Sequence, residues 1–180
     1  MKINIAIIGC GSIGEKRFKN LNKNFNVVAC SDKELSNISF LKKKNKILKT
    51  NNWKKIFQIE NLEAVIISTY HSSLSEILHY SVKNKINSFV EKPAGTDPKL
   101  LKKILKLNRS KKTKIRIGFN HRFHPSILKA ANIIKNGYLG KIMYIRSIYG
   151  HGGRKNYDKE WRFNKKLSGG GELIDKGSHL

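Results

Sequence analysis

Six residues near the N-terminus have the spacing of a phosphate-binding turn. Residues 9–14 read Gly-Cys-Gly-Ser-Ile-Gly and follow directly on the isoleucine-rich run Ile3–Ile8. The first glycine lets the chain turn sharply out of a strand, the second lets backbone approach a pyrophosphate, and the third lets the next helix pack closely. That helix presents free N–H groups and the positive end of its dipole. The candidate dinucleotide ligands here are Gly9, Gly11, Ser12, Ile13 and Gly14.

A carboxylate follows the glycines at the distance that a ribose contact requires. Residues 26–30 form a predicted strand, residues 12–23 supply the helix before it, and Asp32 lies just beyond it. In dinucleotide-binding folds, an acid about 20 residues after the glycines accepts hydrogen bonds from ribose hydroxyls. Asp32 also fits a loop aspartate or a helix cap. A carboxylate would repel a 2′-phosphate, so we expect NAD rather than NADP, although the adjacent Lys33 softens that preference.

The residues after Asp32 keep alternating between strand and helix patterns. Such alternation predicts an α/β fold with a doubly wound parallel sheet, a Rossmann domain that we place in residues 1–120. After residue 120 the pattern changes, and we expect a helix, an exposed strand, a long loop and a final helix. The predicted strands cover residues 46–49, 64–68, 86–90, 114–119 and 141–149, and the predicted helices cover residues 35–43, 52–59, 72–83, 97–107, 125–135 and 171–180.

Polar groups follow three of the predicted strands, at the carboxyl ends where open α/β sheets bind ligands. Taken alone, a histidine here fits a solvated loop residue, and a Glu-Lys pair fits an exposed ion pair that contributes little stability. Together with the glycine loop, these groups converge on one edge of the sheet. They are Thr69 and His71 after the fourth strand, Glu91, Lys92 and Pro93 after the fifth, and residues 118–122 at the end of the sixth.

Four motifs in this order and spacing resemble the Gfo/Idh/MocA family, which includes glucose–fructose oxidoreductase and inositol dehydrogenases. The resemblance covers essentially the whole chain. It implies an NAD(P)-dependent oxidoreductase acting on CH–OH groups of sugars, sugar nucleotides or cyclitols, with a second α/β domain built on an open antiparallel sheet. The motifs are the glycine loop, Glu91-Lys92-Pro93, Gly118-Phe119-Asn120-x-Arg122, and Gly169-Gly170-Gly171-x-Leu173-x-Asp175-x-Gly177-x-His179.

The resemblance implies catalytic roles for Lys92, Asp175 and His179. Lys92 would contact the substrate hydroxyl and the nicotinamide ribose, Pro93 would form the often cis turn that aims it, and His71 would lie near cofactor or substrate. A separation of four residues puts Asp175 and His179 on one helical face. Hydride transfer from a carbinol carbon needs a base for the hydroxyl proton, and a histidine oriented by a carboxylate suits that task. A nearby lysine would stabilise the developing alkoxide.

The same resemblance implies a small sugar or cyclitol as the partner, and it allows a homo-oligomer for a full-length protein. It implies no metal, because the Asp and His of the last motif lack a third ligand. Arginines in the loop before that motif suit a phosphate or carboxylate, although they also fit an ordinary surface. The candidate substrate-binding residues are Asn120, Arg122, Arg154, Trp161 and Arg162.

The net charge of +25 raises the question of a nucleic-acid partner. The lysines are dispersed over nearly every predicted helix and loop rather than gathered on one face with aromatic residues, so we expect no specific nucleic-acid binding. No apolar run approaches 18 residues and no signal peptide is evident, so no membrane partner is expected. Cys10 and Cys30 lack C-x-x-C spacing. A cytoplasmic location is the resulting expectation.

Family members are about twice as long as 180 residues, as two domains require. Residues 121–180 would therefore be only the beginning of the C-terminal substrate domain. The chain would be a fragment, a prematurely terminated product or a subunit completed by another chain. Two functions remain open: an oxidoreductase or its N-terminal part, and a dinucleotide-binding module without turnover.

Overall fold

A six-stranded parallel sheet in the order β3-β2-β1-β4-β5-β6 organises the first two thirds of the chain. The computed structural model describes residues 2–41, 46–150, 152–153 and 155–179. The order places β1 and β4 side by side at the centre, where the direction of winding reverses and where such sheets bind ligands. The strands are β1 (Ile3–Ile8), β2 (Phe25–Ser31), β3 (Leu48–Thr50), β4 (Ala64–Ile67), β5 (Asn87–Val90) and β6 (Ile115–Ile117).

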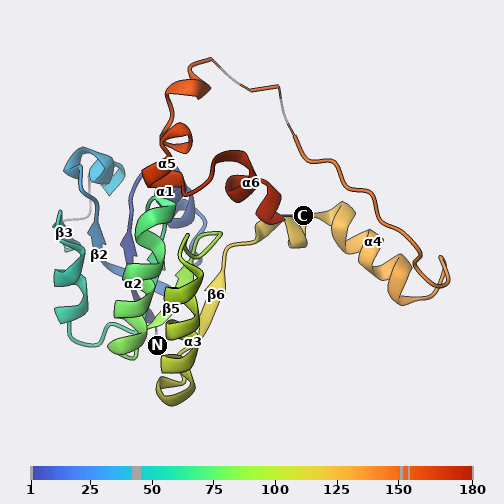
Figure 1. Cartoon of the computed structure of the whole chain (residues 1–180). Helices are drawn as coiled ribbons and strands as arrows, with labels where there is room; N and C mark the ends of the chain where they lie inside the picture. The colour runs from blue at the N-terminus through green and yellow to red at the C-terminus, as the bar shows by residue number, and fades with distance from the viewer. Residues whose placement is uncertain (1, 42–45, 151, 154, 180) are drawn as a thin grey trace.

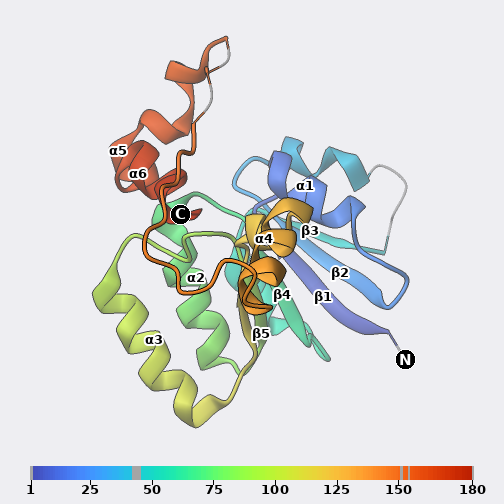
Figure 2. The same cartoon turned by 90° about the vertical axis from the view of Figure 1, so that its right-hand side faces the viewer.

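Helices cover both faces of the sheet, as the continuous apolar strands require. In β1 the side chains alternate, so that Ile5 and Ile7 belong to one core cluster and Ala6 and Ile8 to the other. α2 (His71–Lys83) and α3 (Pro98–Lys111) lie on one face, and α1 (Ser12–Lys19) lies on the opposite face (Figure 2). The predicted doubly wound parallel sheet is confirmed.

Two segments predicted as helices form 3₁₀-helices rather than α-helices. They are η1 (Leu35–Leu41) and η2 (Trp53–Gln58), and Asn52 caps η2 by accepting a hydrogen bond from the Lys54 N–H at 3.0 Å. Residues 42 and 43, at the end of the first prediction, lie outside the described residues. α1 ends at Lys19, four residues earlier than predicted. There the Asn20 side-chain amide donates a hydrogen bond to the Lys16 carbonyl oxygen at 2.7 Å.

The C-terminal third forms a short arm and a docked segment. α4 (Pro125–Lys135) follows the short 3₁₀-helix η3 (Asn120–Phe123) and projects away from the sheet (Figure 1). The chain then runs back to the sheet, where the helices of residues 157–179 pack against the start of α2. These are η4 (Tyr157–Lys159), η5 (Trp161–Phe163), α5 (Lys165–Ser168), α6 (Gly171–Asp175) and η6 (Gly177–His179).

Two predictions for this part of the chain are wrong. Residues 141–149 pair with no strand among the described residues, because an alternating pattern selects a face but cannot supply a partner. The helix predicted from Gly171 stops at Asp175 and continues as η6, so Asp175 and His179 do not share one helical face. Gly177, a weak helix former, lies where the helix breaks. In the described ranges, no helix has the length and apolar character needed to cross a membrane.

Candidate active site

The geometry of the glycine loop agrees with the role that the sequence predicts for each of its three glycines. Gly9 adopts φ +90°, and a Cβ there would lie 2.5 Å from the backbone of Ser68 after β4. A Cβ on Gly14 would lie 2.0 Å from the Gly9 carbonyl oxygen, so this glycine lets α1 pack against the turn. A Cβ on Gly11 would meet no atom within 4 Å. Gly9 and Gly14 are therefore needed by the fold, whereas Gly11 faces open space.

Asp32 lies directly beside this loop, at the end of β2. Its Oδ2 accepts a hydrogen bond from the Cys10 N–H at 2.6 Å. Its Oδ1 accepts hydrogen bonds from the Glu34 N–H and from the Asn37 side chain, both at 3.0 Å. The carboxylate is thus fixed within reach of a ligand seated on the glycine loop. Asn37 has no role in the sequence motifs, and no pattern in the chain singles it out.

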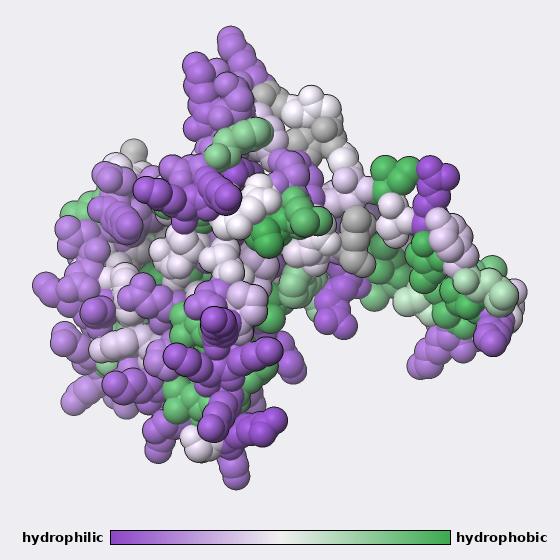
Figure 3. All heavy atoms as spheres, viewed as in Figure 1, coloured by the Kyte–Doolittle hydropathy of each residue, from purple (hydrophilic) through white to green (hydrophobic). Residues whose placement is uncertain are grey.

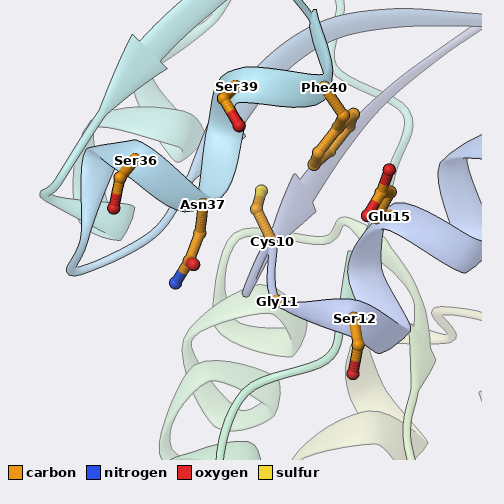
Figure 4. A pocket seen from close by; sticks show the side chains of 8 residues that line it. All are labelled: Cys10, Gly11, Ser12, Glu15, Ser36, Asn37, Ser39 and Phe40. Carbon is orange, nitrogen blue, oxygen red and sulfur yellow. The ribbon is translucent and has the colours of Figure 1, made fainter.

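A pocket of about 430 Å³ opens between the glycine loop and η1. Figure 4 shows side chains of the loop and of α1 on one side and those of η1 on the other. A dinucleotide is implied by the fold, and these residues fit one: the open face of Gly11 leaves room for a pyrophosphate, and the pocket leaves room for an adenosine. The lining residues are Cys10, Gly11, Ser12, Glu15, Ser36, Asn37, Ser39 and Phe40. Ile13 is also exposed on the first turn of α1.

The loops after β4 and β5 complete this edge of the sheet. Ser68 Oγ donates a hydrogen bond to the Gly9 carbonyl oxygen at 2.6 Å, which ties the β4 loop to the glycine loop. Thr69 follows it, half-buried. Glu91 forms an ion pair with Arg17 of α1, with 2.5 Å between Nη2 and Oε1. The described contacts of Glu91 therefore link α1 to β5, and sequence reasoning missed Arg17 because 74 positions separate the two residues.

Lys92, at the carboxyl end of β5, meets Asp175 of α6. Lys92 Nζ donates to the carboxylate Oδ1 and to the backbone carbonyl of Asp175, both at 2.5 Å. Arg162 Nε donates to the other carboxylate oxygen at 3.0 Å. Burial opposes ionisation of Asp175, but the hydrogen bonds and charges of Lys92 and Arg162 outweigh it and lower the pKa of this carboxyl group. The peptide bond between Lys92 and Pro93 is cis.

His71, the first residue of α2, is buried against the docked segment. Its Nδ1 lies 3.0 Å from the Ser168 carbonyl oxygen, and its ring packs edge-on against Trp161 with centroids 4.8 Å apart. Burial lowers the pKa of His71, although the hydrogen bond to Ser168 opposes the shift. A carbonyl only accepts, so the neutral ring carries its proton on Nδ1 and turns a bare Nε2 toward Asp175, 3.8 Å away.

The remaining predicted site residues are His179, Asn120, Arg122, Arg154, Trp161 and Arg162. His179 stacks on His121 of η3, and burial lowers the pKa of His179. Asn120 and Arg122 are exposed, and Arg122 stacks over Phe123 instead of joining the cluster around Asp175. Arg154 lies outside the described residues.

Trp161 and Arg162 do join that cluster, but the Arg162 guanidinium is held by Asp175 and by Glu160, the latter at 2.7 Å. The structure therefore brings together Lys92, Asp175, His71, Trp161 and Arg162.

The chain matches two family models that together cover most of its length. The model described as "Oxidoreductase family, NAD-binding Rossmann fold" matches residues 3–119, and the GFO/IDH/MocA C-terminal domain matches residues 127–180.

Curated relatives and solved structures agree with these models. A levoglucosan dehydrogenase of Pseudarthrobacter phenanthrenivorans is 26% identical over 73% of this chain and 34% of its own length. A myo-inositol 2-dehydrogenase of Thermotoga maritima is 25% identical over 79% of this chain and 43% of its own length. The crystal structure of a myo-inositol 2-dehydrogenase from Lactobacillus plantarum superposes with a TM-score of 0.86 at 27% identity, covering 97% of this chain and 53% of that one.

The chain thus spans about half, or less, of the length of these relatives. With its glycine loop, its sheet order and both domain models in agreement, the chain belongs to the Gfo/Idh/MocA family of oxidoreductases, which have an NAD-binding Rossmann fold.

Proposed function

We propose that this chain carries the cofactor site and the catalytic groups of a dehydrogenase that oxidises a carbinol carbon of a sugar or cyclitol. The contact between Lys92 and Asp175 carries the proposal. It joins two residues 83 positions apart, one from the end of β5 and one from the docked segment, at the edge of the sheet that bears the glycine loop. A levoglucosan dehydrogenase and a myo-inositol 2-dehydrogenase among the relatives support the same substrate class.

In the proposed reaction, an alcohol and NAD⁺ become a ketone, NADH and a proton. When bound, the nicotinamide takes up the hydride from the carbinol carbon. His179 accepts the hydroxyl proton, which a neutral imidazole does well near pH 7. Lys92 donates to the oxygen as it becomes an alkoxide. Asp175 holds the Lys92 ammonium in place and offsets its charge.

The glycine loop and Asp32 would hold the cofactor. Gly11, Ser12 and Ile13 would meet the pyrophosphate, Gly9 and Gly14 would shape the turn that presents them, and Asp32 would accept hydrogen bonds from the adenosine ribose. Because Asp32 is a carboxylate beside the loop, we propose NAD over NADP. His71, Thr69, Glu91 and Pro93 would shape the nicotinamide end. Residues 1–120 would be the cofactor domain and residues 121–180 the start of the substrate domain.

The proposed substrate-binding residues fall into two groups. Trp161 and Arg162 lie in the cluster around Asp175. The exposed Asn120 and Arg122 have no such contact with the cluster, and they remain substrate-binding candidates by resemblance alone, as does Arg154. The cytoplasmic location and a homo-oligomer of a longer chain also stay predictions.

A substitution of Lys92 tests the catalytic role. The full chain and Lys92→Met are assayed for NADH formation from NAD⁺ with myo-inositol and with levoglucosan. We expect turnover by the unaltered chain and a loss of about 10²–10³-fold in kcat for Lys92→Met, since one donor to the developing oxyanion is removed. NADH affinity, measured by fluorescence titration, should change little. Lys102→Met, on the exposed side of α3, is the matched control.

Two outcomes would contradict the proposal. Normal turnover by Lys92→Met would exclude Lys92 from catalysis. NADH binding by the unaltered chain without turnover on a broad panel of sugars and cyclitols would favour the second function, a dinucleotide-binding module.

A further inference from the structure

His179 has a ring neighbour that the proposed reaction does not use. Its imidazole stacks on that of His121, with ring centroids 3.9 Å apart and planes inclined by 18°. The Tyr149 ring stands edge-on to both imidazoles, and the Phe119 ring stands edge-on to that of His179. Figure 1 shows the reason: the end of the chain returns to the segment that follows β6.

Within the part of the chain that the structure describes, no hydrogen bond orients the buried side of the His179 ring. Its Nδ1 is buried without a hydrogen-bond partner among the described residues. In many catalytic histidines a carboxylate accepts a hydrogen bond from this nitrogen and fixes the ring. Here the Asp175 carboxylate accepts hydrogen bonds from Lys92 and Arg162 instead. Among the ring contacts of His179, the stack on His121 has the shortest centroid distance and lies nearly parallel to the imidazole plane.

We propose that His121 is a positioning residue for His179: its ring fixes the plane of the His179 imidazole and limits the stacked pair to a single proton. Two imidazolium rings at this separation repel each other strongly. A neutral ring, in contrast, attracts a cation placed over its face. A neutral His121 thus favours proton uptake by His179, and a protonated His121 opposes it. The inference rests on the proposed role of His179 as the base.

Charged groups from other elements act on the same imidazole. Burial lowers the pKa of His179 most, the positive charges of His121 and Lys92 lower it further, and Asp175 raises it. On η3 itself, Arg122 turns its guanidinium over the Phe123 ring, 5.7 Å from the centroid. Tyr149 carries a phenol against both imidazoles. Removal of the His121 ring leaves the Lys92–Asp175 contact in place, so its effect on His179 can be measured separately.

Imidazole NMR spectra of the full chain, recorded across the pH range, test the pairing without any substrate. In His121→Phe a ring remains to stack but no second proton site exists. We expect the titration midpoint of His179 to rise by about one pH unit or more, the size of coupling that separates interacting sites. His124→Asn is the matched control: it removes a histidine three positions away, and asparagine keeps the cap that His124 provides to α4. Its His179 midpoint should equal that of the unaltered chain.

An unchanged His179 midpoint in His121→Phe would overturn the proposal. If that variant fails to fold, His121→Gln, which removes the ring, carries the same expectation for the midpoint.

Kinetics with NAD⁺ and myo-inositol distinguish a positioning role of His121 from a purely structural role. The acidic limb of kcat/KM should shift to higher pH in His121→Phe by the same amount as the NMR midpoint, with KM for NAD⁺ unchanged. His121→Gln should lower kcat more than His121→Phe does, because the stacked ring is gone. A shifted midpoint without any turnover in the unaltered chain would contradict the proposed function and leave the pairing supported.

Discussion

Asp175 is a buried carboxylate held between two cations, and its protonation is tied to folding. Lys92 and Arg162 both donate to it, and together they keep its pKa below the ordinary value of 3.8 in spite of burial. A carboxyl group with a lowered pKa in the folded state contributes stability above its unfolded pKa. That contribution is lost as the pH falls through the folded value. The cluster should therefore be an acid-sensitive point in the molecule.

Replacing this carboxylate should show that dependence directly. Asp175→Asn takes the shared carboxylate away from two partly buried cations, Lys92 and Arg162, so we expect a loss of about 3 kcal/mol in the free energy of unfolding at pH 7. The difference from the unaltered chain should shrink as the pH falls below 3.8, where the carboxyl group of the unfolded chain takes up a proton, and it should vanish below the lowered pKa of the folded state. Urea unfolding at a series of pH values measures it. Asp158→Asn, on an exposed residue, should show no such convergence, and a difference that stays constant with pH would contradict the assignment.

Cys10 lies inside the glycine loop, yet its thiol is buried. The neighbouring Cys30 thiol and burial both raise the pKa of Cys10. A thiol that stays protonated is a poor nucleophile. The loop should therefore keep its shape in the presence of mild oxidants, although a cysteine lies between its first two glycines.

The turn from β1 into α1 assigns different tasks to glycines only a few residues apart. A Cβ at position 14 collides with the Gly9 carbonyl oxygen, whereas a Cβ at position 11 enters open space. Gly14 therefore serves the packing of α1 against the turn, and we propose that Gly11 serves the approach of the cofactor.

Two alanine variants separate these tasks. Gly14→Ala should lower the free energy of unfolding by about 1–3 kcal/mol, since backbone must move to admit the methyl group. Gly11→Ala should keep the stability of the unaltered chain but bind NADH at least about tenfold more weakly, because the methyl group occupies the path of the pyrophosphate. Thermal unfolding and fluorescence titration measure the two effects. A Gly11→Ala variant with full NADH affinity would show that the cofactor does not approach this face.

The elements that sequence could predict are those that local patterns define. The apolar runs of β1 and β4 and the tight turn of the glycine loop agree with the prediction because their residues act close together in the chain. The wrong elements, the strand over 141–149 and the unbroken helix from Gly171, depend on partners or on competition between local contacts.

Site contacts between distant residues carried no local signal. The pairing of Arg17 with Glu91 joins residues 74 positions apart, and the stack of His121 on His179 joins two separate motifs. Arg162 was expected to face substrate, but only the structure shows that Asp175 and Glu160 hold its guanidinium.

At the scale of the whole molecule, apolar side chains gather on the arm formed by residues 123–149. Figure 3 shows them around α4, where they contrast with the hydrophilic surface over the sheet domain. Met143, Tyr144 and Ile148 are 86%, 79% and 84% exposed. An apolar surface of this kind binds other apolar surfaces, including a second copy of the chain.

Substitutions on this arm should change association and not folding. In Tyr144→Lys/Ile148→Lys the altered side chains bury almost nothing, so we expect a change within about 0.5 kcal/mol per site in the free energy of unfolding. Self-association, measured by analytical ultracentrifugation, should decrease. Leu105→Lys removes an exposed leucine of α3, outside the arm, and serves as the control. If both variants and the unaltered chain self-associate equally, the arm is not the surface through which the chain self-associates.

The docked segment of residues 157–179 reaches the sheet through a few contacts, among them those of Ser168 with His71 and of Asp175 with Lys92. About twenty residues separate it from the end of α4, and this tether makes docking an intramolecular event. A covalent connection of about this length supplies an effective concentration in about the millimolar range. An interface too weak to hold a free peptide at micromolar concentration is therefore enough to keep Asp175 beside Lys92. Proteolytic cleavage within residues 141–150 would remove that advantage without touching a single residue of the candidate active site.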